Sequence, residues 1–274
     1  MVSSAAVNIP RGVAGVDVGA TLSKLAFRDR ELALARLPSR DAAGVLAMLS
    51  TWNPRHIAAT GGGAGELGTA IGKAPVLRID EFRAWAAGAP IVAAAAGVAL
   101  PSESLLVSLG TGTSVLALSG GSAHRVGGSA LGGGTLLGLG QLLTTAASFP
   151  ELAALAGQGD RRSVDLLVGD IYREGGISLP RELNAASFGK LASQAPADLA
   201  HALMGLVGEN VAIIATALAR AEGIQTVVYC GSTLEENPAL EGVLAATTRL
   251  FGKEPLFLPQ GAFCGAVGAA ALAG

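Results

Sequence analysis

The alternation of hydrophobic and polar positions predicts consecutive strands at the start of the chain. Residues 13–18 form a short apolar run that is interrupted by Asp17 and closed by Gly19, and residues 22–27 resume the alternation. Two strands around a tight glycine turn form a hairpin. Residues 32–37 are compatible with a third strand. The chain therefore opens with a small antiparallel unit.

The same pattern returns in the second half of the chain. Residues 104–109 read as a strand, residues 110–114 as a glycine turn and residues 115–119 as a second strand, and a third strand runs into Arg125. Between these units, helical and strand periods alternate. They predict helices at 41–52, 66–71 and 80–97, with a bend near Pro90, and strands at 56–60 and 75–79.

Helical spacing dominates the remainder. A helix over 132–146 starts with three glycines, and the longest pattern, 198–221, is apolar nearly all round between 211 and 218. Such a helix is buried or lies at a subunit interface. The other expected elements are helices at 151–156, 163–168, 187–192, 238–250 and 261–272, and strands at 226–230 and 255–258.

Two related halves, each opened by a glycine-turn hairpin, resemble the actin-like and sugar-kinase superfamily. The resemblance implies an α/β, two-lobed actin-like ATPase (ribonuclease H-like) fold, with duplicated mixed β-sheets flanked by helices and ATP in the cleft. We expect residues 1–101 to form the N-terminal lobe and residues 102–274 the C-terminal lobe. The final helix is a candidate to pack back on the N-terminal lobe.

Composition narrows the class of protein. The chain has 274 residues with a net charge of −2 and no dense block of Lys and Arg, so the electrostatic footprint of a nucleic-acid binder is missing. Cys230 and Cys264 are isolated, which favours a reducing cytoplasm. Residues 84–102 carry no charge. They are mostly Ala and Gly and contain Pro90, so a buried helix is favoured over a membrane span.

The first glycine turn offers chemistry for binding phosphate. Gly19 allows backbone N–H groups to approach an anion, Thr21 adds a hydroxyl and Lys24 adds a positive charge. Asp17 is a candidate Mg²⁺ ligand. The alternative is an ordinary hairpin with a surface lysine. A Walker A loop, GxxxxGK[ST], is absent.

The second turn occupies the corresponding position of the second half. Its glycines and hydroxyls are suited to an anion nest, although a tight turn with incidental Thr and Ser is the alternative; they are Gly110, Thr111, Gly112, Thr113 and Ser114. Gly133 and Gly134 open a helix whose amides favour anions, and close helix packing is the competing explanation. Arg125 is suited to bind a carboxylate or a phosphate group.

An acidic pair, Asp80 and Glu81, precedes the long uncharged stretch. A carboxylate at the start of a buried helix is a candidate general base. From the residues alone, charge compensation at the helix N-terminus, with Asp80 as N-cap, is favoured.

Several stretches resemble type II pantothenate kinases, and the match covers nearly the whole chain. GVDVGATLSKLAF is similar to the family's D-x-G-G-T-x-x-K, with Ala20 in place of the second Gly. ATGGGAGEL, LGTGTSVL, the Glu81-Phe82-Arg83-Ala84 context and FLPQGAFCGAVGAAAL are family-like too. The most specific stretch is RVGGSALGGGTLLGLGQLL, since the family carries R-V-x-G-[TS]-x-x-G-G-G-T-x-x-G-L almost unbroken.

The resemblance implies roles for individual residues. Glu81 would be the catalytic base near the 4′-hydroxyl of pantothenate, and Arg125 would bind pantothenate and stabilise the transferring phosphoryl group. Ser114, Gly128, Ser129 and Ala130 would also face pantothenate. The ATP phosphates would be held by Lys24, Thr21, Gly110, Thr111 and Ser114, and Gly231 and Ser232 would line the adenosine side.

The activity that this resemblance implies is ATP- and Mg²⁺-dependent phosphorylation of pantothenate to 4′-phosphopantothenate, the first step of coenzyme A biosynthesis. It further implies a homodimer, with residues 198–221 as the candidate interface, and a possible CoA thioester inhibitor. The cytoplasmic location follows from the isolated cysteines rather than from the resemblance. The alternatives are a kinase of another small alcohol or sugar on the same fold and a non-catalytic nucleotide or metabolite sensor.

Overall fold

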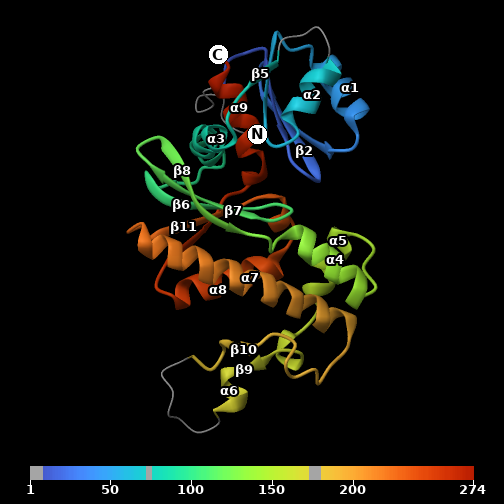
Figure 1. The fold of residues 1–274 in the computed structure, drawn as a ribbon, viewed down its shortest axis with the longest axis vertical. Coiled ribbons are helices and arrows are strands. Elements are labelled where there is room, and N and C mark those ends of the chain that lie inside the picture. Colours follow the sequence, from blue (N-terminus) through green and yellow to red (C-terminus); the bar gives the residue numbers. More distant parts are fainter. Residues whose placement is uncertain (1–8, 72–75, 173–179) are drawn as a thin grey trace.

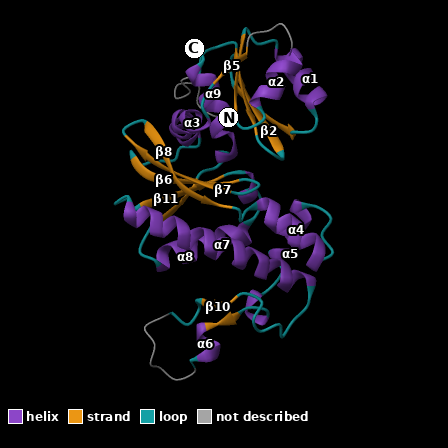
Figure 2. Cartoon of the chain, in the orientation of Figure 1, coloured by secondary structure: helices purple, strands orange, loops and turns teal. Residues whose placement is uncertain are grey.

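Two five-stranded sheets with the same internal order form the framework of the molecule (Figures 1 and 2). The structure is a computed structural model that describes residues 9–71, 76–172 and 180–274. The first sheet has the order β3-β2-β1-β4-β5 and the second β8-β7-β6-β11-β12. In each, three antiparallel strands are followed by two parallel ones. The predicted duplication is therefore confirmed.

The strands fall close to the positions that the alternation predicts. The first sheet comprises β1 (Val13–Val18), β2 (Leu22–Arg28), β3 (Leu32–Pro38), β4 (His56–Thr60) and β5 (Val76–Arg78). The second comprises β6 (Glu103–Leu109), β7 (Thr113–Ser119), β8 (Ser122–Ser129), β11 (Thr226–Cys230) and β12 (Glu254–Phe257). Pro75, the expected start of β5, lies outside the described residues.

Helices cover the outer face of each sheet. On the first sheet, α1 (Ala42–Trp52) and α2 (Ala64–Ile71) bury an apolar cluster that includes Val16, Leu25 and Leu49. The second sheet is covered by α4 (Gly133–Leu143), α5 (Phe149–Ala156), α7 (Pro196–Ala221) and α8 (Pro238–Leu250). Within the described residues, α7 is the one helix long and apolar enough to cross a membrane, but 67% of its apolar stretch is buried inside the protein. We therefore assign α7 to the core of this half.

Two further helices lie between the inner faces of the sheets (Figure 1). They are α3 (Glu81–Ala95) and α9 (Cys264–Leu272), and their apolar cluster includes side chains from both sheets, such as Val13 and Leu106. The helices approach so closely that a Cβ atom added at Gly88 would lie 1.8 Å from the carbonyl oxygen of Cys264. At Gly268 it would lie 1.7 Å from the carbonyl oxygen of Ala84. Only glycine fits these positions, so the contact fixes how the sheets face each other.

The last helix of the chain thus packs on the first sheet. A Cβ atom at Gly15 of β1 would lie 1.9 Å from the carbonyl oxygen of Ala266 in α9. The division of the chain at residues 101 and 102 stays a prediction. Each proposed half supplies the strands of one sheet, and α9 returns from the second half to the first.

The predicted helices at 163–168 and 187–192 are wrong. The first region contains a short 3-10 turn, β9 (Leu166–Leu167) and α6 (Val168–Ile171), and β10 (Asn184–Ala186) pairs with β9 before the second region turns. The buried Asp165 holds these segments together, because its carboxylate accepts a hydrogen bond from the backbone N–H of Phe188 and pairs with Arg161. Burial raises the pKa of Asp165. This long-range contact overrides the local helical pattern.

The close contact between α3 and α9 gives a first prediction. Gly88→Ala forces a methyl group onto a backbone carbonyl and should lower the free energy of unfolding by about 1–3 kcal/mol. Gly138→Ala is the control, since Gly138 lies on the exposed side of α4 with nothing near its Cβ position, and it should be neutral or stabilising by up to about 1 kcal/mol. Urea unfolding measures both. Equal stability of the two variants would contradict the packing described here.

Candidate active site

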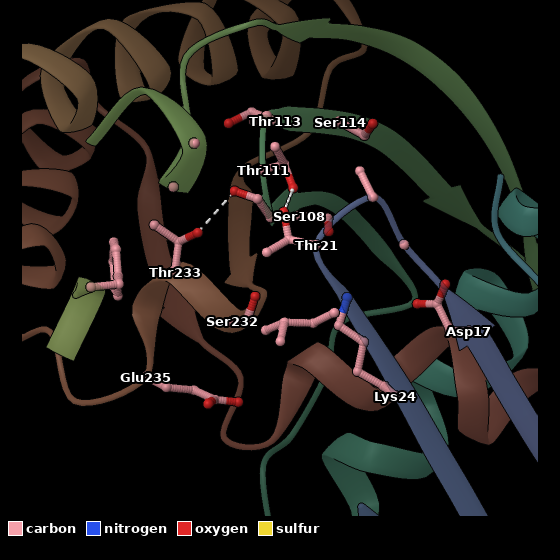
Figure 3. A pocket seen from close by; sticks show the side chains of 18 of the residues that line it. Asp17, Thr21, Lys24, Ser108, Thr111, Thr113, Ser114, Ser232, Thr233 and Glu235 are labelled. Carbon is pink, nitrogen blue, oxygen red and sulfur yellow. Dashed lines mark hydrogen bonds between the residues drawn. The ribbon is translucent and has the colours of Figure 1, made fainter. Parts of the chain in front are cut away.

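A cavity of about 700 Å³ lies between the two inner faces, and both halves of the chain line it (Figure 3). Many of the residues that the sequence singles out come together there. They are Asp17, Gly19, Thr21, Lys24, Glu81, Gly110, Thr111, Gly112, Ser114, Ser129, Gly133, Gly134 and Ser232. Residues from opposite ends of the chain therefore share one site.

The first turn is closed by its own backbone. The N–H of Gly19 donates to the carbonyl of Leu22 at 3.3 Å, which completes the hairpin between β1 and β2. Asp17 and Lys24 are directly opposite in this hairpin and so lie on the same face of the sheet. That face is the inner one, and Figure 3 shows Lys24 pointing into the cavity. The lysine is thus part of the site rather than of the outer surface.

The second turn is braced by the helix that follows it. The backbone N–H groups of Gly133 and Gly134 donate to the carbonyls of Gly110 (2.8 Å) and Thr111 (2.9 Å). Thr233 adds a hydroxyl hydrogen bond to the carbonyl of Gly110 at 2.9 Å. The first amides of α4 therefore shape the turn, which agrees with the packing explanation for these glycines. Both glycines still line the cavity.

The two turns meet across the cavity. The hydroxyl oxygens of Thr21 and Thr111 lie 2.9 Å apart in a hydrogen bond, and Figure 3 shows this contact between the lobes. Hydroxyl groups, glycine backbone and the Lys24 ammonium group thus surround one small volume. Such an arrangement is suited to an anion with several oxygen atoms, such as a polyphosphate.

Asp17 is the buried carboxylate of the site, with 4% of its surface exposed. Its pKa is raised from the ordinary 3.8 to about 6, chiefly because burial disfavours the charged form. The Lys24 ammonium group opposes this shift, and the nearby Glu81 carboxylate adds to it.

Glu81 and Asp80 have different positions, although they are neighbours in sequence. The Asp80 carboxylate caps α3 by accepting a hydrogen bond from the backbone N–H of Arg83 at 3.0 Å. Glu81 occupies the first turn of α3 and lines the cavity, whereas Asp80 does not. The capping explanation therefore applies to Asp80, and Glu81 is the acid that faces the site.

Four predicted residues lie outside the cavity lining: Arg125, Gly128, Ala130 and Gly231. Arg125 is exposed on β8 next to a β-bulge. Its guanidinium group lies beside Gly128, since a Cβ atom there would be 2.6 Å from its Nη2 atom. Gly128 is paired with Ser114, which lines the cavity. Arg125 is thus next to the site, but its guanidinium group is not among the lining.

The cavity also contains residues that the sequence reasoning missed: Arg36, Trp85, Ser108, Phe149, Thr233, Glu235 and Glu236. Trp85 had a detectable signal, because it follows Glu81 by four residues and shares its face of α3. Arg36 and Glu235 form an ion pair that joins β3 to the opposite lobe. No local pattern predicts this pair, since its partners are distant in sequence.

Comparison with known proteins assigns the chain to a family. A family model described as Fumble matches residues 41–272. A type II pantothenate kinase of Bacillus cereus (strain G9842) is 33% identical over 265 residues, which cover 93% of this chain and 96% of the relative. The chain belongs to the type II pantothenate kinase family. The resemblance seen in its motifs is therefore confirmed.

Solved structures agree on the fold of this type II pantothenate kinase family member. The activator of the 2-hydroxyisocaproyl-CoA dehydratase from Clostridium difficile with bound ADPNP has a TM-score of 0.64 at 17% identity, with coverage of 95% of this chain and 93% of the other. A ROK family glucokinase from Streptomyces griseus, in complex with glucose and AMPPNP, gives 0.58 at 15% identity, with coverage of 95% and 98%. The predicted two-lobed actin-like fold class is confirmed.

The buried Asp17 gives a prediction for pH dependence. A carboxyl pKa that is higher in the folded than in the unfolded state lowers stability as pH rises from about 4 to about 6, by about 3 kcal/mol for this shift, and no further above it. The Asp17→Asn variant has no carboxyl group at this position and therefore does not lose stability in this way as pH rises. Its stability relative to the unsubstituted protein should therefore increase over that window and stay constant above it. Urea unfolding without divalent cations measures the difference, and a difference that does not vary with pH would contradict the burial of this charge.

Proposed function

We propose that this protein transfers the γ-phosphoryl group of ATP to the 4′-hydroxyl of pantothenate, the first step of coenzyme A biosynthesis. The observation that carries the proposal is the single cavity in which both glycine turns meet Glu81, in a chain that belongs to the type II pantothenate kinase family. The match covers 96% of the Bacillus cereus relative, so the comparison concerns nearly the full length of that enzyme.

The two turns are suited to hold the phosphates of ATP. Lys24 supplies a positive charge, Thr21, Thr111 and Ser114 supply hydroxyl groups, and the glycines allow a close approach. Phosphoryl transfer depends on positioning and charge neutralisation more than on covalent chemistry. A site built from two braced turns on opposite lobes provides such positioning. Gly231 and Ser232 follow β11 on the C-terminal side, where we place the adenosine.

Asp17 is suited to hold Mg²⁺. Magnesium sites in kinases commonly use one or two carboxylates together with substrate phosphates and water. No group of three or more His, Cys, Asp or Glu side chains that could hold a metal occurs among the residues that the structure describes. One buried carboxylate on the cavity wall fits a site that the phosphates complete. When bound, Mg²⁺ would neutralise charge on the phosphate oxygens.

Glu81 is the proposed general base. Glu81 lines the cavity and does not perform the capping role of Asp80. A carboxylate there can accept the proton of the 4′-hydroxyl as this oxygen attacks phosphorus. Ser129 lines the same cavity, and we propose that Gly128, Ser129, Ala130 and Arg125 contact the acceptor from β8. For Arg125, this requires its guanidinium group to turn from Gly128 toward the site.

We further propose a cytoplasmic homodimer. Most of α7 is buried within its own chain, but Asn210, Ile213, Ala217 and Arg220 form an exposed stripe along it. Ile213, an apolar side chain with 40% of its surface exposed, supports this stripe as the interface. Inhibition by a CoA thioester stays a prediction.

The competing functions are a kinase of another small alcohol or sugar and a non-catalytic sensor. The likeness to the glucokinase concerns the fold alone, because the identity is 15%. Against a sensor stands the presence of Glu81 and Lys24 in the same cavity. Family membership and the site therefore favour pantothenate.

Replacement of the base tests the mechanism. Glu81→Gln should lower kcat by about 10²- to 10⁴-fold while ATP affinity is largely kept, because the amide cannot accept the proton. The matched control is Asp80→Ala, which should keep most activity and lose about 1 kcal/mol of stability through the missing cap. Steady-state kinetics and urea unfolding give both values. Near-normal turnover in Glu81→Gln would remove Glu81 from this role.

Competition between acceptors tests the substrate. With ATP, Mg²⁺ and equal concentrations of pantothenate and glucose, we expect phosphopantothenate as the dominant product by mass spectrometry. Glucose lacks the amide and carboxylate of pantothenate, so a site built for one substrate should discriminate strongly between them. Phosphorylation of glucose without phosphorylation of pantothenate would reject the proposed acceptor.

A further inference from the structure

A row of charged residues crosses three neighbouring strands on the inner face of the first sheet. Lys24 on β2 lies directly opposite Asp17 on β1 and directly opposite Arg36 on β3. Residues directly opposite in antiparallel strands project from the same face with their Cβ atoms about 5 Å apart. Like charges in such pairs are destabilising. The stability of the sheet therefore does not explain why Arg36 lies beside Lys24.

Both cations face the cavity. Among the described residues, Lys24 and Arg36 are the lysine and arginine that line it. The Arg36 side chain is 50% exposed, and its guanidinium group forms an ion pair with the Glu235 carboxylate, which is 29% exposed. Glu235 comes from the opposite lobe and lines the same cavity. The pair thus forms part of the wall of the site.

We propose that Arg36 is a second phosphate-binding cation, which exchanges the Glu235 carboxylate for a phosphate group of the nucleotide. The inference rests on the proposed function, in that ATP occupies the cavity. An exposed ion pair is weak and opens readily. Arginine binds phosphate through two parallel N–H···O hydrogen bonds, a stronger interaction. The exchange is therefore favourable when a phosphate is present.

Lys24 alone does not balance the negative charge that a triphosphate keeps after it binds one Mg²⁺ ion. Lys24 lies opposite the Asp17 carboxylate and opposes the rise of the pKa that burial causes there, so part of the positive charge of Lys24 is offset within the protein. Glu81, Glu235 and Glu236 add further negative charge around the cavity. A second cation beside Lys24 offsets this charge, and Glu235 keeps that cation in place until the nucleotide binds.

The exchange has opposite consequences for the two partners. Arg36→Gln removes a charged donor to phosphate and should weaken binding of AMPPNP by about 10- to 100-fold, while binding of adenosine, which has no phosphate, stays unchanged. Glu235→Gln removes the competing carboxylate and should strengthen binding of AMPPNP by about two- to fivefold.

Calorimetric titration without an acceptor tests this proposal. AMPPNP with Mg²⁺, and adenosine, are titrated into the full-length protein, into each single variant and into the charge-reversed double variant Arg36→Glu/Glu235→Arg. Arg40→Gln is the matched control, since Arg40 is exposed near the end of β3 and does not line the cavity, and both affinities should be unchanged in it. We expect the double variant to bind AMPPNP as weakly as the Arg36→Gln variant does.

Two results would overturn the proposal. If Arg36→Gln weakens the binding of AMPPNP and of adenosine equally, Arg36 does not contact phosphate. If both single variants weaken AMPPNP binding and the charge-reversed double variant restores it, the ion pair acts by holding the two lobes together and not by binding phosphate. Because no acceptor is present, the titration is independent of the substrate proposal: a protein that binds AMPPNP but does not phosphorylate pantothenate contradicts only the proposed function.

Discussion

The close contact between α3 and α9 is the constraint on which the site depends. Glycines at the contact bring backbone against backbone, at Gly88 with Cys264 and at Gly268 with Ala84. Each helix also packs on strands, so the contact ties the inner faces of both sheets into one apolar cluster. With the faces held in this way, the turns after β1 and β6 lie opposite each other. The hydrogen bond between Thr21 and Thr111 is a direct consequence.

The same constraint places charge where the proposed reaction needs it. Glu81 begins α3, so the helix that joins the lobes also carries the proposed base to the edge of the cavity. Asp17 on β1 lies within contact range of α9, because a Cβ atom added at Gly265 would be 2.6 Å from its carboxylate. Packing and chemistry thus share residues.

Local sequence patterns were sufficient for the strands of the two five-stranded sheets, the long helices and the two turns. Strand alternation, glycine punctuation and helical spacing act over a few residues, and each predicted turn is found in the cavity lining. The patterns failed where distant contacts decide the structure. The Asp165 carboxylate accepts a hydrogen bond from the backbone N–H of Phe188, and Phe188 takes a positive φ of 59°. This conformation is incompatible with the helix that the local pattern predicts there. Likewise, nothing near Arg36 in sequence indicates Glu235 as its partner.

Arg125 and Glu81 show the limits of motif reasoning from opposite sides. For Glu81, the residues alone favoured a structural role and the family resemblance a catalytic one, and its position in the cavity agrees with the second. For Arg125, the motif is highly specific, yet the side chain lies over Gly128 beside the site. A motif gives the identity of a residue, whereas its rotamer depends on the surrounding strands and on what is bound.

The central claim is that the cavity couples ATP to an acceptor alcohol. The most direct measurement is the rate of ADP release from ATP and Mg²⁺, with and without pantothenate. We predict a slow rate without pantothenate and a large, saturable increase when it is added, with one phosphopantothenate formed per ADP. An ADP release that is equally fast without pantothenate, or that is absent under both conditions, would contradict the account.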